Sequence, residues 1–289
     1  MRNALRGGLI ACTLGLGISA LVAPLGGQQA PGYKAPRAAD GHPDLNGIWQ
    51  ALNSANYDIE PHVARAAMQL RPGPYGPLPA KEVLYFGAVG AVPAGMGIVD
   101  GGQIPYKPEA LKIRNENREK WVERDPEIKC YLPGVPRANY MPYPFQIFQS
   151  NSAFFIAYEY AGAVRNVYLK DPGEAPVDTW MGQSVGRWEG ETLVITGTGF
   201  NGQAWFDRAG DYQTDRLHVV ERYTLAGPDT IRYEATIEDP NLYTRPWKIS
   251  MPLYRRLEKN AQLVDYKCVE FAEEMLYGDV VKPTRRASN

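Results

Sequence analysis

The sequence predicts a mainly β protein, an antiparallel β-barrel of about eight to ten strands preceded by an N-terminal extension rich in proline and glycine. From Phe145 onward, β-branched and aromatic runs follow one another at short intervals. The connections between them are short, such as Ala161-Gly162 and Gly227-Pro228, which suits antiparallel hairpins and not parallel crossovers. A meander of so many strands has to curl or close to protect its edges.

Residues 1–30 have the pattern of an export signal. Arg2 and Arg6 form a short basic region, the apolar run 8–23 follows, and small and polar residues come after it. Because the run is too short for a stable membrane span, we expect a mature chain that has no transmembrane span and is periplasmic or secreted. Three cleavage positions stay open, after Ala20, Ala23 or Ala30.

Residues 31–143 form the predicted extension. Proline and glycine recur too often there for long regular elements, because proline removes a backbone donor and glycine weakens helix and strand alike. We expect a first strand at 45–52 and helices at 61–70 and 108–124, the second of which begins with Pro108. The apolar stripe of this second helix is thin, so most of the helix should face solvent.

Residues 144–278 contain the predicted barrel and a C-terminal helix. Alternation supports the strands, for example Phe154 and Ile156 on one face. The expected strands are 145–149, 153–160, 163–169, 191–200, 217–226, 229–239, 247–258 and 262–268. The helix at 269–278 ends at a glycine, and a flexible tail at 279–289 follows.

Residues 182–186 spell G-x-S-x-G, the pattern of the nucleophilic serine of α/β-hydrolases. That role needs a strand before Ser184 and a helix after it. Instead, turn and loop residues precede the motif and a strand pattern follows it. We therefore predict a glycine-jointed turn in which Ser184 bonds to the local backbone, and we expect Ser184→Ala to leave any activity within a few-fold.

The charge balance excludes one class of partner. The chain has 31 basic and 32 acidic residues and a net charge of −1, with no block of Lys or Arg that could follow a phosphate backbone. We therefore expect no nucleic-acid partner.

The metal-ligand types are too scattered to predict a metal site or a cofactor. The three histidines, His42, His62 and His218, are not spaced for zinc. Asp207, Asp211 and Asp215 recur at four-residue spacing, but they lack the central glycine and closing glutamate of a calcium-binding EF-hand loop. A polar loop between two strands is the better interpretation.

Cys130 and Cys268 remain once the predicted signal, with Cys12, is removed. In an oxidising compartment such a pair is expected to form a disulfide. Two separately buried thiols are the alternative, because a sequence does not prove connectivity. On the chain-entropy model a disulfide closing so long a loop stabilises by roughly 4–5 kcal/mol.

If the protein is an enzyme, we predict its acid/base residues on and just before the strand 217–226. His218 and Arg222 share one face of that strand. His218 with Asp207 or Asp215 could form an oriented acid/base pair, and Arg222 could hold an anionic group. A structural histidine whose bonds are satisfied is the alternative.

Glu221 is predicted on the other face of this strand, next to Leu217 and Val219. A carboxylate among apolar neighbours is either paired or has a perturbed pKa. We consider Arg245 and Arg255 as its partners.

Aromatic side chains crowd the second half of the chain and could line a pocket for a flat or apolar ligand. The predicted ligand-binding residues are Trp180, Trp188, Trp205, Tyr223, Tyr233 and Trp247. An ordinary aromatic core explains most of them equally well.

Several motifs resemble those of a family of exported bacterial proteins. They are PDLNGIW at 43–49, KCYLPGVPR at 129–137, TWMGQSVGRWEG at 179–190, DPNLYTRPW at 239–247 and YKCVEF at 266–271. The resemblance covers nearly the whole mature chain and implies export and a single fold, but no particular reaction. Because the two cysteine segments recur together in the family, it also implies the Cys130–Cys268 disulfide. Gly47 and Trp49 additionally resemble the Gly-x-Trp of lipocalins, which implies a calycin-like barrel with the tryptophan at its closed end.

Three functions follow from these observations. The first is an exported protein that binds a small apolar or aromatic ligand in a barrel pocket. The second is a periplasmic acid/base enzyme, a hydrolase, lyase or isomerase, on the same barrel. The third is an interaction subunit of a cell-envelope complex that docks through the extension. A pocket lined by aromatic residues favours binding, whereas one that holds His218 within reach of Asp207 or Asp215 favours catalysis.

Overall fold

The structure, a computed structural model, describes residues 33–63, 70–71, 74–75, 78–79 and 94–270. The predicted signal and tail lie outside these residues, as does most of the predicted helices 61–70 and 269–278. The parts of those two helices that are described are not helical, and Leu70 belongs to a short strand. Within the described part of the chain, no helix has the length and apolarity that crossing a membrane requires.

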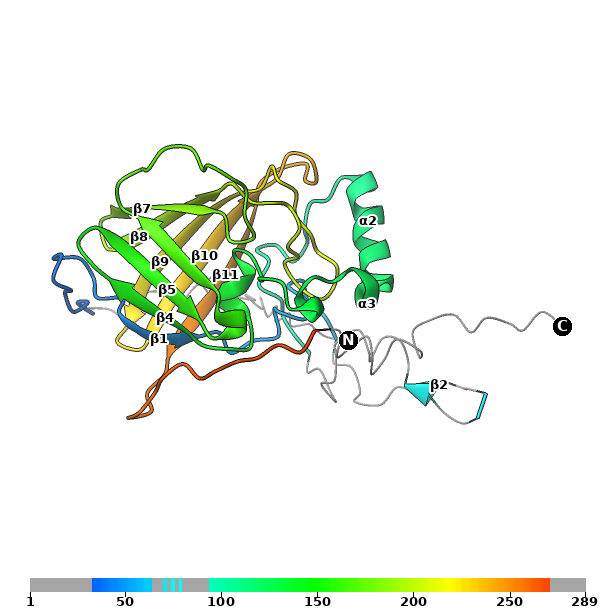
Figure 1. The fold of residues 1–289 in the computed structure, drawn as a ribbon, viewed down its shortest axis with the longest axis horizontal. Helices are drawn as coiled ribbons and strands as arrows, with labels where there is room; N and C mark the ends of the chain where they lie inside the picture. The colour runs from blue at the N-terminus through cyan, green and yellow to red at the C-terminus, as the bar shows by residue number, and fades with distance from the viewer. Residues whose placement is uncertain (1–32, 64–69, 72–73, 76–77, 80–93, 271–289) are drawn as a thin grey trace, which may run out of the picture.

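Nine strands form a closed barrel, which confirms the mainly β prediction (Figure 1). Around the barrel their order is β1-β11-β10-β9-β8-β7-β6-β5-β4, and β1 closes it by pairing with β4. All neighbours are antiparallel except β6 and β7, which are parallel. The strands are β1 (Gly47–Gln50), β4 (Phe145–Gln149), β5 (Ala153–Tyr158), β6 (Val164–Tyr168), β7 (Gln183–Glu189), β8 (Thr192–Thr198), β9 (His218–Gly227), β10 (Thr230–Glu238) and β11 (Trp247–Arg255).

The strand β1 is part of the barrel although it precedes β4 by almost a hundred residues of the chain. Trp49 is fully buried, its indole N–H donates to the carbonyl of Leu45 at 2.9 Å, and the Arg255 guanidinium lies 4.2 Å from its ring centre. Gly47 makes this arrangement possible, because a Cβ there would lie 2.2 Å from the guanidinium nitrogen of Arg255. The strand that carries Gly47 and Trp49 therefore closes the barrel between β4 and β11.

Two segments differ from the sequence prediction. Residues 183–189, expected as a turn, form β7, and the turn follows at Gly190, which has a φ of 60°. Residues 262–268, expected as a strand, have no regular structure. That segment ends at Cys268, which forms a disulfide with Cys130, so this predicted pairing is present.

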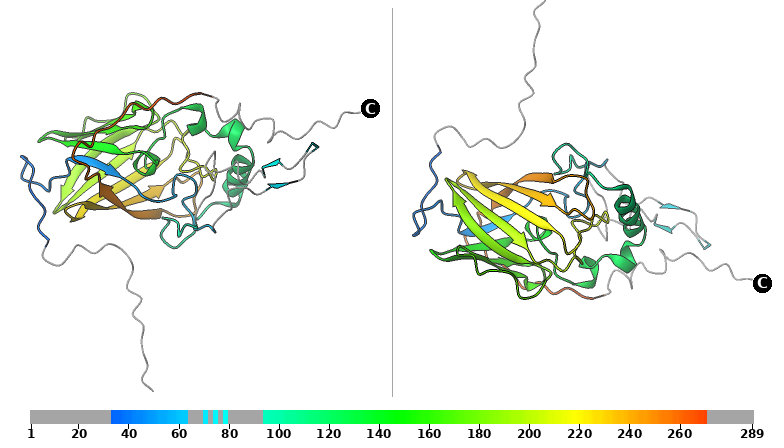
Figure 2. Two further views of the ribbon diagram at one scale, coloured as in Figure 1. Left: turned by 90° about the horizontal axis from the view of Figure 1, so that it is seen from below. Right: turned by 90° about the horizontal axis from the view of Figure 1, so that it is seen from above.

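Among the described residues, two helices lie outside the barrel, α2 (Pro108–Glu119) and α3 (Trp121–Arg124), together with a small hairpin of β2 (Leu70–Arg71) and β3 (Leu78–Pro79). Figure 2 shows α2 and α3 beyond one end of the barrel, with the segment 33–46 at the other end. Three short 3-10 turns are η1 (Glu127–Lys129), η2 (Arg137–Tyr140) and η3 (Tyr160–Gly162).

The helix α2 starts at Pro108, as predicted, but the face that it buries is polar. Arg114 and Asn117 are buried beside Ala110, whereas Leu111 and Ile113 are exposed. The helix therefore contacts the rest of the protein through hydrogen bonds and charge. The apolar stripe in its sequence does not identify the face that is buried.

Candidate functional site

The strand β9 has the two faces that its sequence predicts. Val219, Glu221 and Tyr223 are buried, while His218 and Arg222 are half-buried on the outer face. The outer face carries the predicted acid/base residues away from the barrel interior.

The four predicted catalytic residues are not brought together. Arg222 forms an ion pair with Glu189 at 2.8 Å on the outside of the barrel. Asp215 is exposed, whereas Asp207 is fully buried. Among the described residues, no hydrogen bond or ion pair joins His218 to Asp207 or Asp215. The reason is geometric, because His218 projects outward from the sheet and Asp207 lies in a buried loop.

Glu221 belongs to a polar network inside the barrel. Its ion-pair partner is Arg165 of β6, and not Arg245 or Arg255 as the sequence suggested. Tyr223 and Tyr233 donate hydrogen bonds to it at 3.0 and 2.8 Å. Burial and the Glu221 carboxylate raise the pKa of both tyrosines well above the ordinary value, so their hydroxyls stay protonated.

Ser184 is also part of this network and does not form a nucleophile elbow. It is the second residue of β7 and is buried, and its hydroxyl oxygen accepts a hydrogen bond from Arg165 Nε at 2.7 Å. Through Arg165 and Glu221, the interior network therefore links Ser184 to Tyr223 and Tyr233 and fills this part of the barrel with polar side chains.

The other predicted aromatic ligands are dispersed. Trp180 stacks on Tyr131 with ring centres 4.9 Å apart, and Trp188 stacks on His42 at 4.6 Å. Trp205 and Trp247 are buried in the core. Tyr223 and Tyr233 share the interior network, and the four tryptophans lie elsewhere, so the six predicted residues do not form one cluster.

A pocket of about 700 Å³ opens where β1 ends, between residues 50–58 and the segment 94–98. This volume is in the usual range for small-molecule sites. Its apolar lining consists of Ala51, Leu52, Ala55, Ala94, Met96, Ile98 and Pro142, and its polar lining includes Gln50, Asn53, Ser54, Tyr57 and Asp58. An apolar wall with a few polar groups is typical of a ligand site.

Short-range hydrogen bonds fold the chain around this pocket. The carbonyl of Ser54 accepts from the N–H groups of Tyr57 and Asp58, and the side chain of Asn53 accepts from the N–H of Ala55. Beyond this turn, Ile98 N–H donates to the carbonyl of Ile59 at 2.8 Å. These bonds fix the two walls of the pocket relative to each other.

Three buried aspartates, Asp58, Asp207 and Asp211, lie directly behind the pocket. One carboxyl oxygen of each lies within 4.8 Å of the others. Asp58 belongs to both features, since it lines the pocket and is a member of this carboxyl cluster.

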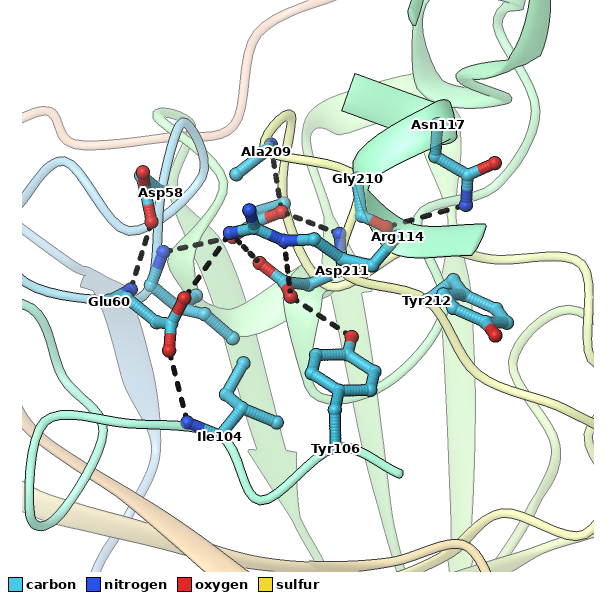
Figure 3. Close-up of polar contacts among 12 residues, drawn as sticks. Asp58, Glu60, Ile104, Tyr106, Arg114, Asn117, Ala209, Gly210, Asp211 and Tyr212 are labelled. Atoms are coloured by element: carbon cyan, nitrogen blue, oxygen red, sulfur yellow. Dashed lines mark hydrogen bonds and ion pairs between the residues drawn. The ribbon is translucent and has the colours of Figure 1, made fainter. Parts of the chain in front are cut away.

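Backbone N–H groups and a side chain of α2 form hydrogen bonds to two members of the carboxyl cluster (Figure 3). Asp207 accepts hydrogen bonds from the N–H groups of Ile59, Ala209 and Asp211 at 2.8 to 3.1 Å. Arg114 of α2 holds both oxygens of Asp211 at 3.1 and 3.2 Å and also reaches Glu60. The polar face of α2 is buried because it supplies this charge.

Burial shifts the protonation of the carboxyl cluster. Burial, the charges of Asp211 and Asp58, and a hydrogen bond with Asp211 raise the pKa of Asp207 well above its ordinary value. Burial, followed by the charge of Asp211, raises the pKa of Asp58 to about 7. The cluster therefore holds protons near neutral pH, and Asp58 is the member that faces the pocket.

The carboxyl cluster offers oxygen ligands of the kind that hard metal ions use, but its oxygens already have partners. Arg114 occupies Asp211, and three backbone N–H groups occupy Asp207. Because these oxygens already have partners, we assign no metal ligand here. Asp215, the third aspartate of the spacing considered above, lies elsewhere and lines an exposed pocket of about 620 Å³.

Ser54 and His62 form a second polar pair at the pocket. Ser54 Oγ lies 3.0 Å from His62 Nε2, and both residues are half-buried. No motif predicted this pair, because Ser54 and His62 fit no catalytic pattern. The polar run 53–58 directly after the Gly-x-Trp strand is the one signal that could have drawn attention to it.

No protein-family model and no curated protein matches this chain.

The raised pKa of Asp58 makes a prediction about stability. An unfolded aspartate titrates near pH 4, whereas Asp58 in the folded protein titrates at about 7. Between those values the folded state keeps a proton that the unfolded state has released, so rising pH reduces stability by up to about 1.4 kcal/mol per pH unit for this group. Asp58→Asn should therefore gain stability relative to the wild type between pH 4.5 and 7.5, as measured by urea unfolding. The same substitution at the exposed Asp178 is the control for the loss of a surface carboxylate. A stability difference for Asp58→Asn that does not change with pH would refute the assignment.

Proposed function

We propose that this protein binds a small, largely apolar ligand with a cationic or hydrogen-bond-donating group, and that its site is the pocket beside Asp58. The observation that carries the proposal is Asp58 itself, which is only 4 % exposed and lines a pocket of about 700 Å³ with a mainly apolar wall. Apolar surface supplies affinity, and one polar group in such a wall supplies orientation.

The neighbours of Asp58 explain why a cationic or donor group would suit this pocket. Arg114 binds Asp211 and Glu60. Burial and the charge of Asp211 outweigh the opposing charges of Arg114 and Arg118 and raise the pKa of Asp58 to about 7. A positively charged ligand group beside Asp58 favours its ionised form and is itself stabilised by the carboxylate. Binding of a cation should therefore weaken as the pH falls below about 7.

The proposed site is not inside the barrel, where the sequence predicted the ligand. Tyr223 and Tyr233 face the interior, but their hydroxyls form hydrogen bonds to Glu221, and Glu221 forms an ion pair with Arg165. The pocket opens instead at the end of β1.

We also propose that the protein acts outside the cytoplasm, and the Cys130–Cys268 disulfide supports this because disulfides persist in oxidising compartments.

A matched pair of probes tests the proposal. 2-Phenylethylamine and 2-phenylethanol have the same shape, but only the first is a cation. At pH 8, isothermal titration should show that Asp58→Asn weakens binding of the amine about tenfold or more, the usual loss for a charge-assisted hydrogen bond. Binding of the alcohol should change by about threefold at most, because its neutral hydroxyl bonds to an amide as well as to a carboxyl.

Asp178→Asn is the matched control, because Asp178 lines the exposed pocket of about 620 Å³ and should leave both affinities unchanged. An unchanged affinity of the amine for the Asp58→Asn protein would overturn the proposal. An equal loss in the Asp178→Asn protein would move the site to the other pocket.

A further inference from the structure

Ser54 and His62 have the geometry of a nucleophile and its base. Ser54 Oγ lies 3.0 Å from His62 Nε2, within the reach that proton transfer needs. His62 Nδ1 faces the carbonyl oxygen of Val63 at 3.4 Å. A carbonyl oxygen only accepts, so a proton on Nδ1 would satisfy this contact and would make Nε2 the acceptor for the Ser54 hydroxyl. This is the tautomer that a general base requires.

The backbone holds this pair in place at the pocket. His62 and Gly95 exchange two hydrogen bonds of 2.9 Å, N–H to carbonyl in both directions. A Cβ at residue 95 would lie 2.4 Å from His62 Nε2 and 2.8 Å from Ser54 Oγ. Only glycine fits there without pushing the two reacting atoms apart, and both Gly95 and Ser54 line the pocket.

We propose that Ser54 is a nucleophile activated by His62, and that this pocket hydrolyses small carboxylic esters. The inference rests on the proposed function, because it uses the same pocket, with Asp58 orienting a cationic or donor group of the ester. It assigns to Ser54 the role that the G-x-S-x-G pattern would give to Ser184, which is buried and bonded to Arg165.

The reaction takes two steps. In the first, Ser54 Oγ forms a bond to the ester carbonyl carbon while its proton moves to His62 Nε2; the bond from that carbon to the alcohol oxygen breaks, and the alcohol leaves with the proton. In the second, a water molecule from solvent attacks the acyl group and gives a proton to Nε2. The bond to Oγ then breaks, Oγ recovers the proton, and a carboxylic acid is released.

A fluorophosphonate probe tests for the nucleophile on the full mature chain, because it phosphonylates activated serines. Intact mass and peptide mapping should place a single label on Ser54, and the wild type should hydrolyse phenylalanine p-nitrophenyl ester, whose ammonium group is the cation that Asp58 would orient. Ser54→Ala should lose both the label and the hydrolysis. A label on another serine, or unchanged turnover by Ser54→Ala, would overturn the inference.

Two further variants separate a chemical role from a structural one. His62→Gln keeps an amide near Ser54 Oγ but cannot take up a proton, so labelling should slow by about a hundredfold or more, as expected for loss of a general base. A merely structural pair predicts no change. Ser152→Ala is the control and should label at the rate of the wild type. Ser152 lies in the β4–β5 turn, and because β1 and β4 are antiparallel, this turn is at the opposite end of the barrel from Ser54.

Failure of this inference can be told apart from failure of the proposed function. A wild type that binds 2-phenylethylamine but takes no label and hydrolyses no ester refutes the role of Ser54 and leaves the binding site in place. Retained amine binding by Ser54→Ala shows that this variant is folded. If it does not fold, the labelling rate of His62→Gln decides.

Discussion

Replacing Arg165 with methionine should lower the free energy of unfolding by about 3–5 kcal/mol, as expected when one partner of a buried ion pair is removed. Arg165 and Glu221 are both buried within the barrel, and the guanidinium is the cation that pairs with this carboxylate. Without it, Glu221 would have to remain charged in the interior or take up a proton, and either costs stability. Urea unfolding at pH 7 measures the loss.

A matched control is available on the other face of β9. Arg222 pairs with Glu189 at 2.8 Å, but both side chains are more than a third exposed. Arg222→Met should therefore cost about 0–1 kcal/mol. The double variant Arg165→Met, Glu221→Leu removes both charges and should recover much of the loss. Equal losses for Arg165→Met and Arg222→Met would show that the interior pair is not needed for stability.

Reducing the Cys130–Cys268 disulfide should lower the free energy of unfolding by roughly 4–5 kcal/mol on the chain-entropy model. The two cysteines are 138 residues apart, and the loop between them contains every barrel strand except β1. A loop of this length strongly restricts the unfolded chain, and that restriction is lost on reduction. Urea unfolding with and without a phosphine reductant gives the difference.

The Cys130→Ala, Cys268→Ala variant provides the control for the reductant. It should unfold at the lower urea concentration in both buffers, since it has no disulfide to reduce. Two thiols that react in the native protein before reduction, or a reductant that leaves the unfolding midpoint of the wild type in place, would contradict the prediction.

Local patterns were sufficient for most of the barrel. The run 145–149 forms β4 with its predicted limits, and β9 has the alternation that puts Glu221 inside. These successes have one cause, because a strand with one buried face shows its burial in a period of two residues. The prediction of the partner of Glu221 was wrong. The partner, Arg165, lies on β6, and which strands face each other across a barrel depends on the strand order, which local patterns do not show.

The prediction of a turn from glycine residues was wrong for residues 183–189. Gly186 suggested a turn, but it lies within β7, where a Cβ would come 2.8 Å from Val167 of the neighbouring strand β6. Glycine serves there for close approach and not for bending. The segment 262–268 alternates like a strand yet pairs with none in the described structure, since β11 already pairs with β1 and β10.

The candidate site could be predicted only in part. Asp207 was singled out from its loop, but its neighbour Asp58 and the Arg114 that neutralises Asp211 come from distant parts of the chain. Asp211 and Arg114 are 97 residues apart. Contacts of this range leave no periodicity in the sequence, and a helix that buries a polar face gives no apolar stripe to read.

Hydrogen-exchange mass spectrometry with saturating 2-phenylethylamine at pH 8 tests most directly whether the pocket at the end of β1 is the ligand site. Bound amine should slow exchange in residues 50–58 and 94–98, which form the pocket, and Asp58→Asn should abolish that protection. Protection confined to residues 171–187, around the pocket that contains Asp178, or to the barrel strands that carry Tyr223 and Tyr233, would contradict the claim.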